Sequence, residues 1–182
     1  MNKKLLWCLG IAAVLAGGFF ILNSYIYEEK QVVATTDYKD AEYVIEGQRV
    51  KLENGAAETE AAPGSASKIV TSYFGNELKT DLNADGREDV VFLLTQNPGG
   101  SGTFFYTVAA LNTERGYVGS EAFLLGDRIA PQTTNPDPER ASVVIVNYAD
   151  RAPNEPMTAR PSMGKSVWLK LNTQTMQLEQ VK

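Results

Sequence analysis

Histidine is absent from the chain, and only one cysteine occurs among its 182 residues. Without histidine, the usual general base of serine and cysteine hydrolases is missing, as is the commonest ligand of zinc, copper and iron. The cysteine, Cys8, lies in an apolar stretch near the N-terminus, so the rest of the chain has no internal disulfide to form. The stability of the folded part therefore depends on packing, hydrogen bonds and any bound ion.

Basic residues are also few and scattered. Lysine and arginine number 17 against 22 acidic residues, which gives a formal net charge of −5. The sequence has no basic cluster to neutralise phosphates, so we expect no binding to nucleic acid. The length suits one ordinary domain with an anchor and a linker.

Charged residues are missing from residues 5–22, LLWCLGIAAVLAGGFFIL, and the uncharged stretch extends to Tyr27. About 20 helical residues span the apolar core of a bilayer. Lys3 and Lys4 precede the stretch, and positive charge favours the cytoplasmic side. We therefore predict a cytoplasmic N-terminus at residues 1–4, a single transmembrane signal anchor at residues 5–27, and an extracytoplasmic remainder held at the cell membrane.

Two other kinds of N-terminal signal fit less well. A signal peptide cleaved after Ala16 would leave an apolar new terminus that begins at Gly17. A lipoprotein requires a small residue before the modified cysteine, but Trp7 precedes Cys8. The uncleaved anchor is preferred, and cleavage is the second interpretation.

Beyond the anchor, residues 28–40 are polar and predict a juxtamembrane linker, whereas residues 41–182 predict one folded domain. Short runs rich in Val, Ile, Phe, Tyr and Thr, bounded by turn residues, are typical of β-strands. These runs are residues 42–45, 49–52, 68–74, 90–94, 104–111, 122–125, 143–148, 167–171 and 176–181. The sequence therefore predicts a mainly β protein, in which one antiparallel domain forms a small barrel or sandwich after the transmembrane helix.

Some runs also indicate where a strand lies in its sheet. Residues 90–94 and 143–146 are continuously apolar, which favours central strands covered on both faces. Residues 69–74 fit a strand but also a helical stripe, so a short helix near 65–75 is the alternative there.

Long loops are predicted at residues 55–67, 131–140 and 151–164, and loops on a rigid sheet are where binding usually resides. Two Asp-Arg pairs, at residues 127–128 and 150–151, are expected to stabilise such loops.

Residues 81–89, DLNADGRED, match the D-x-N-x-D-G-x-x-D pattern of calcium-binding loops. The predicted metal ligands are the side-chain oxygens of Asp81, Asn83, Asp85 and Asp89 and the main-chain carbonyl of Arg87. Oxygen ligands suit Ca²⁺, and carboxylates so close in sequence repel one another unless a cation joins them. The alternative is an Asx/Gly turn in which backbone amides satisfy the carboxylates.

An EF-hand is excluded, because Phe92 stands where the EF-hand has a bidentate glutamate. Residues 81–92, DLNADGREDVVF, instead resemble the calcium loops of FG-GAP/VCBS-type repeats, which join β-strands. With NPGGSGTFFYTVAALN, LGDRIAPQT and VNYADR, the domain is similar to uncharacterised bacterial membrane-anchored envelope proteins. The resemblance implies a β fold, a structural calcium ion and an envelope location, and it implies no activity.

Other short motifs do not meet the requirements of the chemistry they suggest. Residues 97–102, NPGGSG, lack the lysine and the helix of a phosphate-binding loop. Ser101 has no histidine to activate it. Ser162 and Lys165 have the spacing used by penicillin-recognising enzymes, but Pro161 disfavours the helix that those enzymes require.

The leading hypothesis is a non-enzymatic, membrane-tethered interaction or structural module with a calcium loop, which presents a face to an envelope protein or cell-wall partner. A second hypothesis is an inhibitor of an envelope enzyme such as a lysozyme-type muramidase, with residues 151–164 as the inserted loop. A third, a hydrolase with paired Asp or Glu residues, requires two carboxylates in a deep pocket.

Overall fold

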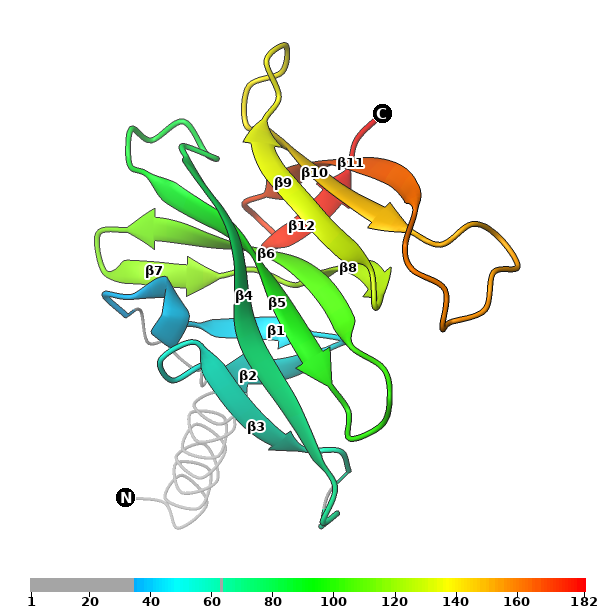
Figure 1. Ribbon diagram of the computed structural model, residues 1–182. Helices are drawn as coiled ribbons and strands as arrows, with labels where there is room; N and C mark the ends of the chain where they lie inside the picture. The colour runs from blue at the N-terminus through cyan, green and yellow to red at the C-terminus, as the bar shows by residue number, and fades with distance from the viewer. Residues whose placement is uncertain (1–34, 63) are drawn as a thin grey trace, which may run out of the picture. The chain divides into compact units, whose positions relative to one another are not determined.

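The computed structural model describes residues 35–62 and 64–182 (Figure 1). The predicted cytoplasmic residues 1–4 and the predicted anchor at residues 5–27 lie outside this part, as do the first residues of the predicted linker. Within the described ranges, no helix has the length and apolar character needed to cross a membrane.

The described residues form one short 3₁₀ helix and a series of β-strands. The elements are η1 (Tyr38–Asp40), β1 (Glu42–Ile45), β2 (Gln48–Lys51), β3 (Ala56–Glu60), β4 (Lys68–Thr80), β5 (Asp89–Asn97), β6 (Phe104–Thr113), β7 (Gly116–Gly119), β8 (Phe123–Asp127), β9 (Ala130–Pro136), β10 (Val143–Asp150), β11 (Met163–Asn172) and β12 (Gln177–Gln180). Neighbouring strands pair antiparallel throughout. The predicted mainly β, antiparallel domain is confirmed.

The strands form three sheets, in which neighbours in sequence are mostly neighbours in space. A six-stranded sheet has the order β3-β4-β5-β6-β7, with β8 also paired to β6; a four-stranded sheet has the order β12-β11-β10-β9; and β1 pairs with β2 (Figure 1). The edge of β6 is divided between two partners, because its first half pairs with β8 and its last residues pair with β7.

The six-stranded sheet lies between two hydrophobic cores. On one face, Phe92 and Leu94 of β5 pack with Tyr43 and Val50 of the β1–β2 hairpin. Side chains on the opposite face, such as Leu93, pack with residues of the four-stranded sheet. The alternating side chains of β5 thus enter both cores, and the prediction that residues 90–94 form a central strand covered on both faces is confirmed.

For residues 143–146 the same prediction is met only in part, because Val143, Val144 and Val146 are buried whereas Ile145 is half-buried. Val144 and Val146 of β10 lie in the core shared with the six-stranded sheet, but Ile145 and Asn147 on the other face are only half-buried. β10 is central within its sheet, between β9 and β11, yet that sheet is an outer layer in the described structure. The apolar run therefore correctly indicated a central position within the sheet, but the outward face of β10 is covered only in part, at Val143 and not at Ile145.

Two segments predicted as loops contain strands, and the helical alternative near 65–75 is wrong. β3 lies within residues 55–67, and β9 begins at Ala130 and takes up the first part of residues 131–140. Both are edge strands, where polar residues and proline are tolerated because one side of the backbone has no strand partner. β4 continues as a strand through the ambiguous segment, since β3 and β5 supply hydrogen-bond partners on its two sides.

The end of the predicted linker contacts the domain. Thr35 bridges to Tyr117 of β7, and the Tyr117 amide donates a hydrogen bond to the Thr35 carbonyl at 2.7 Å. Tyr38 of η1 packs against Phe92 with a ring-centroid distance of 5.4 Å. Among the residues that the structure describes, the contacts of the folded unit therefore already include Thr35, within the predicted linker.

Candidate functional site

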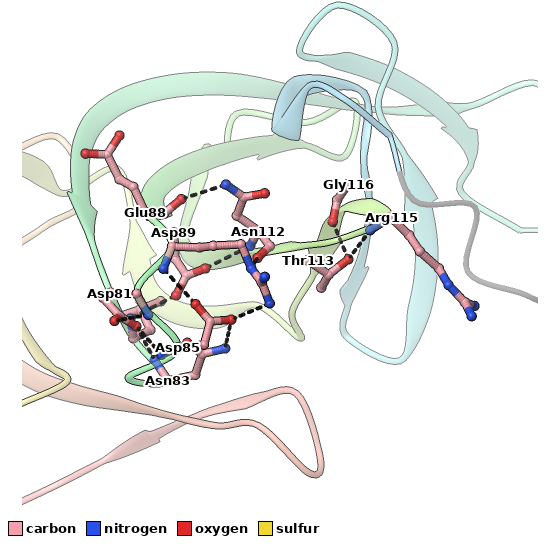
Figure 2. Close-up of polar contacts among 12 residues, drawn as sticks. Asp81, Asn83, Asp85, Glu88, Asp89, Asn112, Thr113, Arg115 and Gly116 are labelled. Carbon is pink, nitrogen blue, oxygen red and sulfur yellow. Dashed lines mark hydrogen bonds and ion pairs between the residues drawn. The ribbon is translucent and has the colours of Figure 1, made fainter.

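The acidic loop connects β4 with β5, at the end of the six-stranded sheet (Figure 2). Its turn requires left-handed backbone at two positions, Ala84 with φ of 61° and Gly86 with φ of 84°. Glycine adopts this conformation readily, whereas alanine does so at a cost of about 1–2 kcal/mol. The loop is thus held in a conformation that its side-chain hydrogen bonds must stabilise.

Asp81 forms the inner support of this turn. Its Oδ1 accepts the amides of Asn83 and Asp85, both at 3.2 Å, and its Oδ2 accepts the amide of Gly86 at 2.8 Å (Figure 2). The hydrogen bond from Gly86 is the main cause of a lowered pKa at Asp81, which favours the ionised carboxylate.

Asp85 faces the one positive charge of the loop. Its Oδ1 accepts the Arg87 amide at 2.8 Å, and its Oδ2 accepts the Asn83 side-chain amide at 3.0 Å and the Arg87 guanidinium at 2.9 Å. The Arg87 amide is the main cause of the lowered pKa of Asp85. A metal ion that bound the Asp85 carboxylate would therefore compete with the Arg87 guanidinium.

Asp89 differs from the other two carboxylates because it is fully buried. Its Oδ2 accepts the amide of Leu82 at 2.8 Å, and its Oδ1 accepts the amide of Asn112, at the end of β6, also at 2.8 Å (Figure 2). Burial raises the pKa of Asp89, and the negative charges of Asp85 and Asp81 raise it further. Asp89 therefore joins the acidic loop to β6.

Asn112 is the residue of this site that the sequence pattern did not indicate. Its amide bonds to Asp89, its carbonyl accepts Nε of Arg87 at 2.9 Å, and its side chain donates to the Glu88 carbonyl at 3.3 Å. Only the pairing of β5 with β6 brings it to the loop, so no local motif could have revealed it.

The five predicted ligands lie in one loop but do not all face one point. Asp81 and Asn83 accept the same Asp85 amide, so their Oδ1 atoms lie near each other beside Asp85. Asp89 faces backbone amides in the interior, and within residues 35–62 and 64–182 no cluster of three or more His, Cys, Asp or Glu side chains is arranged for a metal ion. Asp81, Asn83 and Asp85 fit calcium chemically, since they offer side-chain oxygen atoms around a tight turn.

A second group of polar residues holds three loops together. The Thr103 amide donates to Asp127 Oδ1 at 2.9 Å, and the Arg128 amide donates to the Thr103 carbonyl at 2.7 Å. Arg151 then donates to three carbonyls, those of Asp127 at 3.3 Å, Arg128 at 3.0 Å and Ala159 at 2.8 Å. Asp127 pairs with Arg128 as predicted, whereas Asp150 pairs with Lys165 of β11 and not with the Arg151 guanidinium. The loop-stabilising role is therefore confirmed for the first Asp-Arg pair and for Arg151 of the second, and Arg151 holds the base of the exposed residues 153–158.

Two surface hollows lined by described residues do not match the enclosed carboxylate pair of a hydrolase. One lies between β2 and β3, and the other lies beside the β9–β10 turn; both are open to solvent. In the second, Asp137 already accepts the amides of Glu139 and Arg140 and pairs with the Arg140 guanidinium. Neither hollow favours the hydrolase hypothesis.

Comparisons of the chain with protein-family models, with curated proteins and with solved structures find no match. The relation to FG-GAP/VCBS-type loops therefore stays a prediction from residues 81–92.

Replacing Asp89 with alanine is expected to lower the free energy of unfolding by about 2–5 kcal/mol, because the amides of Leu82 and Asn112 would lose a buried acceptor. Denaturant unfolding of the full-length protein measures the change. Glu88→Ala, which removes an exposed neighbouring carboxylate, is the control and should change stability by less than about 1 kcal/mol. Equal losses in both variants would show that Asp89 has no special role in joining the loop to β6.

Proposed function

We propose that this chain is a membrane-tethered, extracytoplasmic interaction or structural module, a β-sandwich stiffened by a calcium ion at the β4–β5 loop. The observation that carries the proposal is the acidic loop, which is pre-shaped by hydrogen bonds and joined to the core through Asp89. The tether is supported by the uncharged residues 5–27 and by Lys3 and Lys4 before them.

The proposed ion is held by the side-chain oxygens of Asp81, Asn83 and Asp85 and by the Arg87 carbonyl, with Asp89 as the remaining ligand. A carboxylate has about four lone-pair sites, so Asp89 can keep both amide hydrogen bonds and still contribute an oxygen. When bound, calcium offsets the repulsion among the carboxylates and cross-links the turn. The missing twelfth-position glutamate predicts modest affinity, which suits the millimolar calcium outside cells.

Calcium is expected to raise the melting temperature of the full-length protein by about 3–6 °C at a concentration about ten times its Kd. Asp85→Ala should abolish the increase, because it removes the carboxylate on the exposed side of the turn. Glu58→Ala, on exposed β3, is the acidic control and should keep the increase. Differential scanning calorimetry with calcium, magnesium or chelator measures these shifts, and an unchanged wild-type melting temperature would remove calcium from the proposal.

Arg87→Gln provides a test in the opposite direction. It removes the guanidinium that pairs with Asp85 at 2.9 Å but keeps the main-chain carbonyl proposed as a ligand. Calcium affinity should rise about two- to fivefold, the effect of one exposed ion pair. A lower affinity would indicate that the loop is an Asx/Gly turn supported by Arg87.

The tether predicts that a C-terminal alkaline phosphatase fusion is active in intact cells and that the full-length protein sediments with membranes. Val14→Arg places a charge in the predicted span at a cost of about 2.5–3.5 kcal/mol and should release protein from the membrane fraction. The tether would be contradicted if a fluorescent protein fused to the C-terminus fluoresced in the cytoplasm and the wild-type protein remained in the soluble fraction after cell lysis.

A second candidate function, inhibition of a lysozyme-type muramidase, is favoured by the braced base of the loop after β10. A loop that is already ordered loses less conformational entropy when it enters a cleft. Arg151 holds the base through three carbonyls, while Met157 near the tip is exposed.

In a muramidase assay, this candidate predicts inhibition that Met157→Asp weakens at least about tenfold, because a buried apolar contact would become charged. Gln48→Ala, on β2, serves as the surface control. If the wild-type protein does not inhibit the muramidase, this candidate function is eliminated, and the proposal of a calcium module is not affected.

A further inference from the structure

The outer face of the four-stranded sheet is partly exposed, because Ile145 and Asn147 of β10 are half-buried there while Val143 and Ala149 are buried. Val144 and Val146 point into the core, so their neighbours Ile145 and Asn147 point outward. Directly paired residues of antiparallel strands share a face. The outer face therefore carries two rows across β9, β10 and β11, namely Asn135, Ile145 and Trp168, then Thr133, Asn147 and Ser166.

The second row is a continuous chain of hydrogen-bonding groups. The Asn147 side-chain nitrogen donates to Thr133 Oγ1 at 2.9 Å, and Ser166 Oγ donates to Asn147 Oδ1 at 2.6 Å. Asn135 joins it from the first row through a hydrogen bond to Thr133 Oγ1 at 2.9 Å. These groups are pre-positioned, and Thr133, Asn135 and Ser166 remain exposed to solvent.

The first row continues into a hollow. Ile145 and Trp168 line it, together with residues 137–140 of the β9–β10 turn and residues 180–182 at the end of β12 and beyond. Arg140 braces this rim, because Nε pairs with Asp137 Oδ2 at 2.8 Å and Nη1 donates to the Lys182 carbonyl at 2.8 Å. Figure 1 shows the β9–β10 turn and the C-terminus at the same end of this sheet.

We propose that this outer face binds a neutral glycan, with Trp168 and Ile145 against the apolar face of a sugar ring and the polar row against hydroxyls of the next unit. The two rows lie about 6.7 Å apart along the strands, since each residue rises about 3.3–3.4 Å. Indole is a large, rigid apolar surface, and amide and hydroxyl side chains can both donate and accept, as ring hydroxyls require.

The charges around the hollow favour an uncharged ligand. The acidic side chains of Asp137 and Glu139 oppose the basic side chains of Arg140 and Lys182, so the rim has no excess positive charge to attract an anionic ligand. The whole chain has a formal net charge of −5, which disfavours anionic polymers. This inference rests on the proposed interaction function and adds the class of partner, an uncharged carbohydrate.

The test uses the full-length Trp7→Phe protein, in which Trp168 is the only tryptophan, in a zwitterionic detergent without a sugar headgroup. The probes are cellotetraose, maltotetraose and a β-1,4-linked N-acetylglucosamine tetramer. We expect at least one of them to change Trp168 fluorescence with half-saturation at about 0.1–1 mM. No saturable change with any probe up to about 10 mM, or binding of an anionic heparin tetrasaccharide alone, would overturn the proposal.

Variants locate the binding by isothermal titration calorimetry. Asn147→Ala should weaken binding about two- to tenfold, the effect of losing one or two hydrogen bonds, and Trp168→Leu should weaken it at least about tenfold. Gln48→Ala, on the separate two-stranded sheet, should bind as the wild type does. Full affinity in both Asn147→Ala and Ser166→Ala would overturn the assignment to this face, even if Trp168→Leu fails to fold.

The outcome is separable from that of the calcium module. If calcium raises the melting temperature but no sugar binds, the calcium module is supported and the glycan proposal is rejected. Sugar binding without a calcium shift would support the outer face and reject the ion.

Discussion

The pairing of β5 with β6 is the constraint on which the described fold depends. The two strands pair from Val90 with Ala110 to Gln96 with Phe104, and their side chains supply both hydrophobic cores. Because both faces of this pair are buried, its register determines which residues enter each core, and a shift by one residue would exchange the two sets. The β1–β2 hairpin and the four-stranded sheet each cover one of these faces.

The same pairing also assembles the acidic loop. Asp89 begins β5 and Asn112 lies at the end of β6, so the register places the carboxylate beside the amide that it accepts. The buried negative charge is tolerated because two backbone amides solvate it in place of water. Asp81 and Asp85 remain at least partly exposed, so the loop combines a buried carboxylate that joins it to β6 with two carboxylates that solvent reaches.

The two proposed binding features lie on different layers and require different chemistry. The acidic loop belongs to the six-stranded sheet and offers concentrated negative charge, whereas the outer face of the four-stranded sheet offers an aromatic ring and neutral hydrogen-bonding groups. Because the two features lie on different sheets, a variant at one of them leaves the contacts of the other unchanged in the structure.

The sequence by itself determined the β character of the domain, most strand positions, the central place of residues 90–94 and the position of the acidic turn. These features depend on local preferences: β-branched and aromatic runs favour strands, and Asp, Asn and Gly favour a tight turn. The edge strands β3 and β9 were predicted as loops, because partly exposed edge strands tolerate the polar residues and proline that are also typical of loops. Only the tertiary structure decided that Ile145 faces outward, that Asp89 faces the interior and that Asn112 joins the site, because each outcome depends on which strands and layers meet across long separations in the chain.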